Sequence, residues 1–94
     1  MGIEQTMTAA RAEALFASTA NTGQRLGRDE MATVIRGAVR RYGGIRGCAE
    51  EMAFAYGDHP EAAAERMRWA RRCVTEVYGS RGWVRPMMRI APRV

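Results

Sequence analysis

Few side chains in this chain of 94 residues have the types and spacing that catalysis needs. His59 is the only histidine, and the sequence holds no serine–histidine–aspartate set, no glycine loop that would cradle a phosphate, and no paired acids beyond surface ones. A general base needs a proton partner and an orienting group, and the residues near His59 suggest neither. We therefore expect a protein that is not an enzyme, with no cofactor and no evident small-molecule substrate.

The two cysteines, Cys48 and Cys73, lie on different predicted helices. Together with the single His59 they give no spacing typical of a pair of metal ligands, so we predict no metal site. We interpret them as buried free thiols in a reducing compartment. A disulfide is the alternative, because spacing alone does not give the geometry of the pair.

Arginine carries all of the basic charge: the chain has 15 arginines, no lysine and a net charge of +5. Residues 1–79 hold eleven arginines against ten acids, so this part of the chain is close to neutral. The remaining arginines follow Gly79, at Arg81, Arg85, Arg89 and Arg93. Arginine together with abundant alanine and glycine is typical of a GC-rich genome, whereas the functional interpretation is recognition of phosphate or carboxylate groups. Those tail arginines are the better nucleic-acid-binding candidates, with Arg68 and Arg72 as weaker ones.

Apolar residues recur at helical spacing in four segments, which predicts helices over 8–18, 29–42, 45–56 and 59–78. Pro86 and Pro92 forbid a continuous helix beyond Gly79. The prediction is an all-α, compact bundle of about four helices with a flexible basic C-terminal tail. We divide the chain into a flexible N-terminus over 1–7, a helical domain over 8–79 and the tail over 80–94.

Polar residues at the predicted helix starts indicate caps. Thr8 and Asp29 are predicted N-caps of the first two helices, and Gly57 offers a left-handed C-cap to the third. In the stretch "YGDHPE", Asp58 is the predicted N-cap of the last helix and Glu61 its N3 residue, an arrangement close to a capping box. Both carboxylates also favour the positive end of the helix dipole.

Three aromatic residues are candidates for binding a protein partner. Phe54 projects away from the apolar stripe of its helix, between Glu50 and Glu51, and is interpreted either as a ring covered by another segment or as an anchor for a partner. Trp69 lies at the margin of its stripe, as a residue at the edge of the core or an interface anchor. Trp83 lies in the tail, which has no predicted core.

The order of residues around the last turn resembles a helix-turn-helix. The stretch "MAFAYG" resembles the first helix of that motif, and "ERMRWARR" is similar to the end of the recognition helix in region 4 of sigma factors, with matches at Arg66, Met67, Ala70 and Arg71. The resemblance covers about twenty residues and implies DNA binding. Asp58, Glu61 and Glu65 depart from the pattern, since they place acids in the half of the helix that would enter the groove.

A second resemblance runs from about Ala14 to Val77. The stretches "ALFAS", "YGDHPE" and "RMRWAR" resemble a group of small helical proteins of high-GC bacteria. The resemblance implies a helical fold with a boundary at Gly79, and no activity comes with it.

The longest apolar runs are only a few residues, against the about 20 that a membrane-spanning helix needs. No basic stretch precedes an apolar block at the start, so we expect no secretory signal and a cytoplasmic protein. The leading functional expectation is a small helical interaction domain that binds a protein partner or itself. The alternative is a nucleic-acid-binding regulator that uses the tail, with or without the corner at 52–72.

Overall fold

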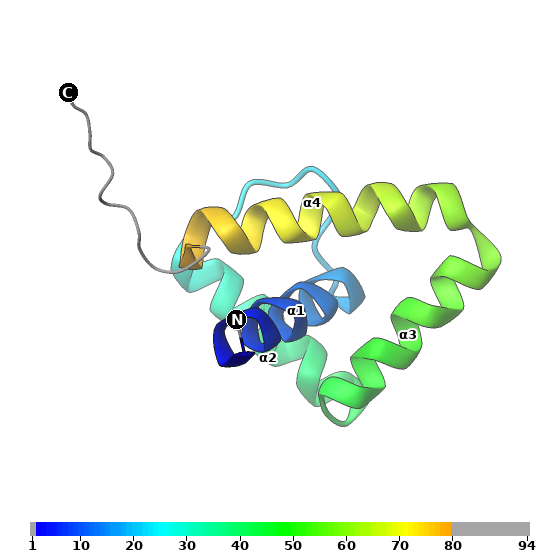
Figure 1. Ribbon diagram of the computed structural model, residues 1–94, viewed down its shortest axis with the longest axis horizontal. Coiled ribbons are helices and arrows are strands. Elements are labelled where there is room, and N and C mark those ends of the chain that lie inside the picture. Colours follow the sequence, from blue (N-terminus) through cyan, green and yellow to red (C-terminus); the bar gives the residue numbers. More distant parts are fainter. Residues whose placement is uncertain (1, 80–94) are drawn as a thin grey trace.

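Four helices make up the fold of residues 2–79, the part of the chain that the computed structural model describes, with side chains described from Met7 onward. They are α1 (Gly2–Ala17), α2 (Arg28–Tyr42), α3 (Ile45–Asp58) and α4 (Pro60–Tyr78), joined by short turns except for the long loop between α1 and α2 (Figure 1). The predicted all-α bundle of four helices is confirmed for these residues. The predicted tail, 80–94, lies outside them.

Helix α1 is the centre of the bundle and packs against α2, α3 and α4. It is buried on several sides, which is why its buried apolar residues are not confined to one narrow stripe. These buried residues are Ala12, Ala14, Leu15, Phe16 and Ala17. The helix begins at Gly2, so the predicted helix start and N-cap at Thr8 were wrong. The segment from Ile3 to Met7 contains no glycine or proline to stop the helix, and its Glu, Gln and Met are good helix formers.

The main core lies between α1 and α4. Leu15, Met31 and Val74 are among its largest fully buried side chains. The apolar spacing of the last helix predicts a buried stripe of Ala63, Met67, Ala70, Val74 and Val77. The first four are buried, as predicted, and Val77 is partly buried. A second cluster of small side chains lets α1 approach α2 and α3 closely; it comprises Ala14, Ala17, Ala38 and Cys48.

Helix α2 begins one residue earlier than predicted, with Gly27 rather than Asp29 at the N-cap. Glu30 at N3 accepts a hydrogen bond from the backbone N–H of Gly27 at 3.2 Å, which satisfies one donor at the helix start. Asp29 lies in the first turn, where its carboxylate still favours the positive end of the dipole.

Two glycines make the sharp corner between α2 and α3. Gly43 caps α2 with φ 76° and ψ 22°, the left-handed conformation that glycine adopts at little cost. Gly47, in the first turn of α3, lies against the end of α2: a Cβ built on it would overlap the carbonyl oxygen of Tyr42. Glycine at position 47 therefore lets the two helices meet closely.

These surroundings predict opposite effects for two glycine-to-alanine changes. A Cβ at Gly37, within α2, meets nothing within 4 Å, so we expect Gly37→Ala to stabilise the protein by about 0.5–1 kcal/mol through helix propensity. Gly47→Ala should instead destabilise it by about 1–3 kcal/mol, because the corner must open. Urea unfolding of both variants tests the pair, and equal effects would contradict the described corner.

The corner between α3 and α4 differs from the prediction. Asp58 is the last residue of α3 and Gly57 lies inside that helix, so neither is the cap that was predicted. His59, with φ −141° and ψ 75°, ends α3 and serves as the N-cap of α4 without a side-chain cap bond. The cause is Pro60 at the first position of α4, because a proline moves the preceding residue out of the helical region. Glu61 lies in the first turn of α4, at N2 rather than at the predicted N3, and the predicted capping box does not form.

The C-terminal end of α4 receives positive charge from the other helices. The Arg28 guanidinium donates a hydrogen bond to the carbonyl of Val77 at 3.0 Å. Arg11 of α1 lies over the ring of Tyr78, with its guanidinium carbon 3.9 Å from the ring centroid. Cations at this position complement the negative end of the helix dipole. These two arginines therefore stabilise the packing of α1 and α2 against the end of α4.

Candidate interaction surface

Phe54 of α3 is the most exposed large apolar side chain among the described residues, with 71% of its surface accessible. The only stacked aromatic pair in this part of the chain joins Phe16 and Tyr56, so no ring partner shields Phe54. Of the two interpretations drawn from the sequence, a ring covered by another segment was wrong for the described residues. A phenylalanine with this much accessible surface is unusual and is a candidate contact for a partner.

The way α3 packs explains this exposure. Cys48 is its only completely buried residue, and Met52 and Ala55 are packed against the core from the same side. At about 100° per residue, Phe54 lies on the flank of the helix away from these three positions. The helix thus covers the bundle along one narrow side and leaves most of its surface free.

Acidic residues surround Phe54. Glu50, Phe54 and Asp58 are spaced four residues apart and so form one line along α3, which we call the Phe54 face. Glu50 and Asp58 are both exposed. From residue 50 to residue 65, across the α3–α4 corner, the chain holds five acids and no arginine. Arg46 is exposed one turn before Glu50 on the same line, so the acids predominate from Glu50 towards the corner. The Phe54 face therefore offers an apolar contact with an acid on each side, and a complementary ligand would be apolar and positively charged.

A different flank of α3 carries two further exposed side chains, Ile45 at 41% and Tyr56 at 37%. Tyr56 is partly occupied inside the protein, since its ring stacks on Phe16 with a centroid distance of 6.0 Å and an interplanar angle of 13°. Ile45 and Phe54 are nine residues apart and therefore project to roughly opposite sides of the helix. Ile45 belongs to a separate surface.

Trp69 is not available to a partner. Its side chain is 3% exposed and belongs to the main core, and its indole Nε1–H donates a hydrogen bond to the carbonyl of Gln24 at 3.0 Å. The suggestion that Trp69 is a partner-binding anchor was therefore wrong, and the alternative of a core residue is confirmed. The Trp69 ring thus lies between α4 and the loop over residues 18–27.

Arg66, which matches the helix-turn-helix pattern, is also committed inside the protein. Its guanidinium donates four hydrogen bonds of 2.7–3.0 Å to the end of α1 and the following loop; the acceptors are the carbonyls of Phe16, Ser18 and Ala20 and the hydroxyl of Thr22. The guanidinium also lies near the rings of Phe16 and Trp69. Burial lowers the pKa of Arg66 from its ordinary value. Arg66 holds the loop onto α4 instead of facing a ligand.

The other arginine candidates divide into two groups. Arg68 and Arg72 are exposed on α4, one turn apart, and remain open to solvent or a ligand. The tail candidates, together with Trp83, lie outside the described residues; the arginines among them are Arg81, Arg85, Arg89 and Arg93. The structure therefore does not bring the α4 arginines and the tail candidates into one described surface.

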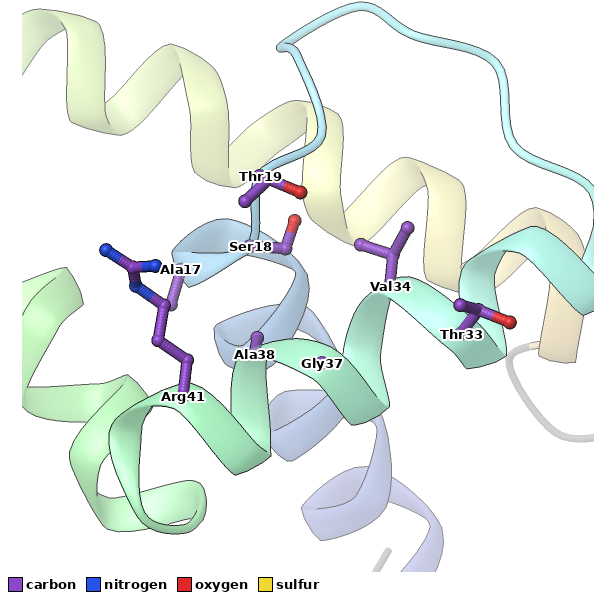
Figure 2. A pocket seen from close by; sticks show the side chains of 8 residues that line it. All are labelled: Ala17, Ser18, Thr19, Thr33, Val34, Gly37, Ala38 and Arg41. Carbon is purple, nitrogen blue, oxygen red and sulfur yellow. The ribbon is translucent and has the colours of Figure 1, made fainter.

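Two hollows on the described surface adjoin the end of α1. One of about 290 Å³ lies between the end of α1 and α2; Figure 2 shows small side chains along it and Arg41, its one charged residue, reaching along its edge from α2. A second, of about 390 Å³, is lined by Glu51, His59 and Arg66 among others. The Arg66 guanidinium there is already occupied by four acceptors within the protein.

Both thiols are free, Cys48 buried and Cys73 half-buried. Burial raises the pKa of the Cys48 thiol, and the nearby Glu13 carboxylate raises it further. Burial and Glu76 raise the pKa of Cys73, while Arg72 opposes them. Because the thiolate is the reactive form, both side chains are poor nucleophiles at neutral pH. The described residues contain no group of three potential metal ligands.

Sequence reasoning placed Phe54 beside Glu50 but assigned Asp58 to the next helix, so it missed that the Phe54 face continues to Asp58. Comparison with protein-family models, with curated proteins and with solved structures gives no match. Among the described residues, no helix combines the length and apolar character needed to cross a membrane.

Proposed function

We propose that this chain is a non-enzymatic binding module whose Phe54 face docks an apolar, positively charged segment of a protein partner. The observation that carries the proposal is the 71% exposure of Phe54 in line with Glu50 and Asp58. Aromatic residues are common hot spots in interfaces because they bury a large apolar area on binding. The acids favour basic partners and disfavour acidic ones, which gives selectivity.

Because Phe54 is proposed to contact the partner from the protein surface, its replacement should weaken binding strongly and change the stability of the fold only slightly. The probes are fluorescent peptides of 15 residues, each with several arginines and one tryptophan or leucine, and matched peptides with glutamate in place of arginine. We expect Phe54→Ala to weaken binding of the basic peptides at least tenfold, or about 1.4 kcal/mol. The free energy of unfolding should change by less than about 0.5 kcal/mol, because the ring lies at the surface.

Ile45→Ala is the matched control, since it removes another exposed apolar side chain of α3 from a different flank. It should leave peptide affinity unchanged. Equal binding of the acidic and basic peptides, or equal affinity of the wild type and Phe54→Ala, would contradict the proposed function.

Nucleic-acid binding is the second candidate, supported by the exposure of Arg68 and Arg72 on α4. The acids between residues 50 and 65 oppose it, because they repel phosphate at the α3–α4 corner. A salt titration of a fluorescent random-sequence DNA duplex separates the two functions. Binding that weakens steeply with salt and is lost in Arg68→Ser/Arg72→Ser would favour nucleic acid on α4. Loss on replacing the tail arginines would favour the tail.

A further inference from the structure

We infer that the segment received by the Phe54 face is the C-terminal segment 80–94 of a second copy of this chain, an inference that rests on the proposed function. The sequence of that segment is SRGWVRPMMRIAPRV. It holds four arginines and no acid, opposite the five acids and no arginine of residues 50–65. The two stretches are therefore complementary in charge.

The segment also supplies apolar side chains that match Phe54. Trp83 is its largest, and the remaining large ones are Val84, Met87, Met88 and Ile90. These residues are interleaved with the arginines, so one segment can cover the phenylalanine ring while its guanidinium groups meet Glu50 and Asp58. Arginine suits this contact because its planar fork pairs with carboxylates and its flat face stacks on aromatic rings.

Chain length limits what the segment of the same copy can place on the Phe54 face. Helix α4 starts at the α3–α4 corner and ends at the opposite side of the bundle, where the segment begins (Figure 1). Its 19 residues span about 28 Å at 1.5 Å per residue. Trp83 is four residues beyond Gly79, which gives it a reach of about 14 Å at full extension. Within one copy Trp83 therefore falls short of the α3–α4 corner, and only the later residues of the 15-residue segment have the chain length to reach the Phe54 face. In a second copy the whole segment, with Trp83 and all four arginines, can lie on that face.

Reciprocal exchange closes the assembly. If each copy places its segment on the Phe54 face of the other, the two contacts are related by a twofold axis and the product is a dimer. A one-way contact would instead leave a free face and a free segment at the ends and allow further copies to add. The dimer should weaken as salt rises, because its exposed charge pairs are screened.

Sedimentation velocity of the full-length chain over a range of concentrations and salt tests the inference. We expect the wild type to dimerise, and Phe54→Ala to raise the dimer Kd at least tenfold. Replacing the tail arginines should have the same effect, in the variant Arg81→Ser/Arg85→Ser/Arg89→Ser/Arg93→Ser. Ile45→Ala should dimerise like the wild type.

Charge reversal supplies a gain-of-function arm. Glu50→Arg/Asp58→Arg should abolish the dimer, and changing the four tail arginines to glutamate in the same chain should restore it. A wild-type chain that stays monomeric up to about 1 mM would overturn the inference, as would a dimer that persists unchanged in Phe54→Ala. The peptide assay then tells the two proposals apart: a monomeric chain that still binds basic peptides through Phe54 retains the proposed function, and one that binds none loses both.

Discussion

Replacing Arg66 by alanine is expected to lower the free energy of unfolding by about 3 kcal/mol, a large part of the stability of a domain of this size. The side chain donates four hydrogen bonds to the end of α1 and the following loop. A bond from a charged donor contributes about 1.5–3 kcal/mol, and four bonds from one group add less than their sum. Water reaches part of this half-buried site, so in the alanine variant it can donate hydrogen bonds to some of the carbonyls that Arg66 leaves unpaired.

The matched variants for Arg66 are Arg66→Lys and Arg68→Ala. Lysine keeps the charge but not the planar fork that reaches several acceptors at once, so Arg66→Lys should still lose about 2 kcal/mol. Arg68 is exposed on the same helix, and Arg68→Ala should change stability by less than about 0.5 kcal/mol. Urea unfolding measures all three, and a lysine variant as stable as the wild type would contradict the described role.

Replacing Trp69 by alanine is expected to cost about 3–5 kcal/mol, the range for large aromatic residues removed from a core. The indole is 3% exposed and packs in the main core between α1, α4 and the 18–27 loop. Its loss leaves a cavity and removes the donor to the Gln24 carbonyl, so Trp69→Ala should also increase the mobility of the loop.

Trp69→Phe separates the two contributions of the tryptophan. Phenylalanine retains much of the packing but donates no hydrogen bond, so we expect a loss of about 1–2 kcal/mol. Hydrogen exchange at the amides of residues 20–27 should rise more in Trp69→Ala than in Trp69→Phe. Exchange that is unchanged in both variants would show that the loop is held independently of Trp69.

Much of the helical architecture could be predicted from local patterns. The apolar spacing in α4 predicted four of its five buried residues, Ala63, Met67, Ala70 and Val74, because the period of a helix follows from neighbouring residues; Trp69 was placed at the margin of the stripe. The corner before α4 was wrong for an equally local reason. Asp58 followed by Glu61 suggested a cap, but Pro60 constrains the residue before it more strongly and moves the break to His59.

The contacts of Arg66 could not be predicted, because most of its acceptors are backbone carbonyls, such as those of Phe16 and Ala20, between 46 and 50 residues away. A carbonyl is present at every position, so the sequence carries no mark of which one a guanidinium will meet. The environment of Phe54 was only partly predictable from the sequence. Its projection away from the apolar stripe was predictable, whereas its exposure depended on how little of α3 the bundle covers.

Assigning Arg66 and Trp69 to the fold changes how the surface is interpreted. The helix-turn-helix resemblance used Arg66 as one of its matches, and that side chain faces the loop instead of a groove. Arg68, Arg71 and Arg72 remain exposed on α4, but the α3–α4 corner before them is acidic and follows the exposed ring of Phe54. This is why we place protein binding before nucleic-acid binding.

The most direct test of this account is a titration of isotope-labelled full-length protein with a basic, tryptophan-containing peptide, followed by amide chemical shifts. The chain used carries serine at the four tail positions, so that its own segment does not compete. We predict that the largest shifts fall on residues 50–58 and that they vanish in Phe54→Ala but persist in Ile45→Ala. Largest shifts on the second half of α4, or shifts that are the same with and without the Phe54 ring, would contradict the account.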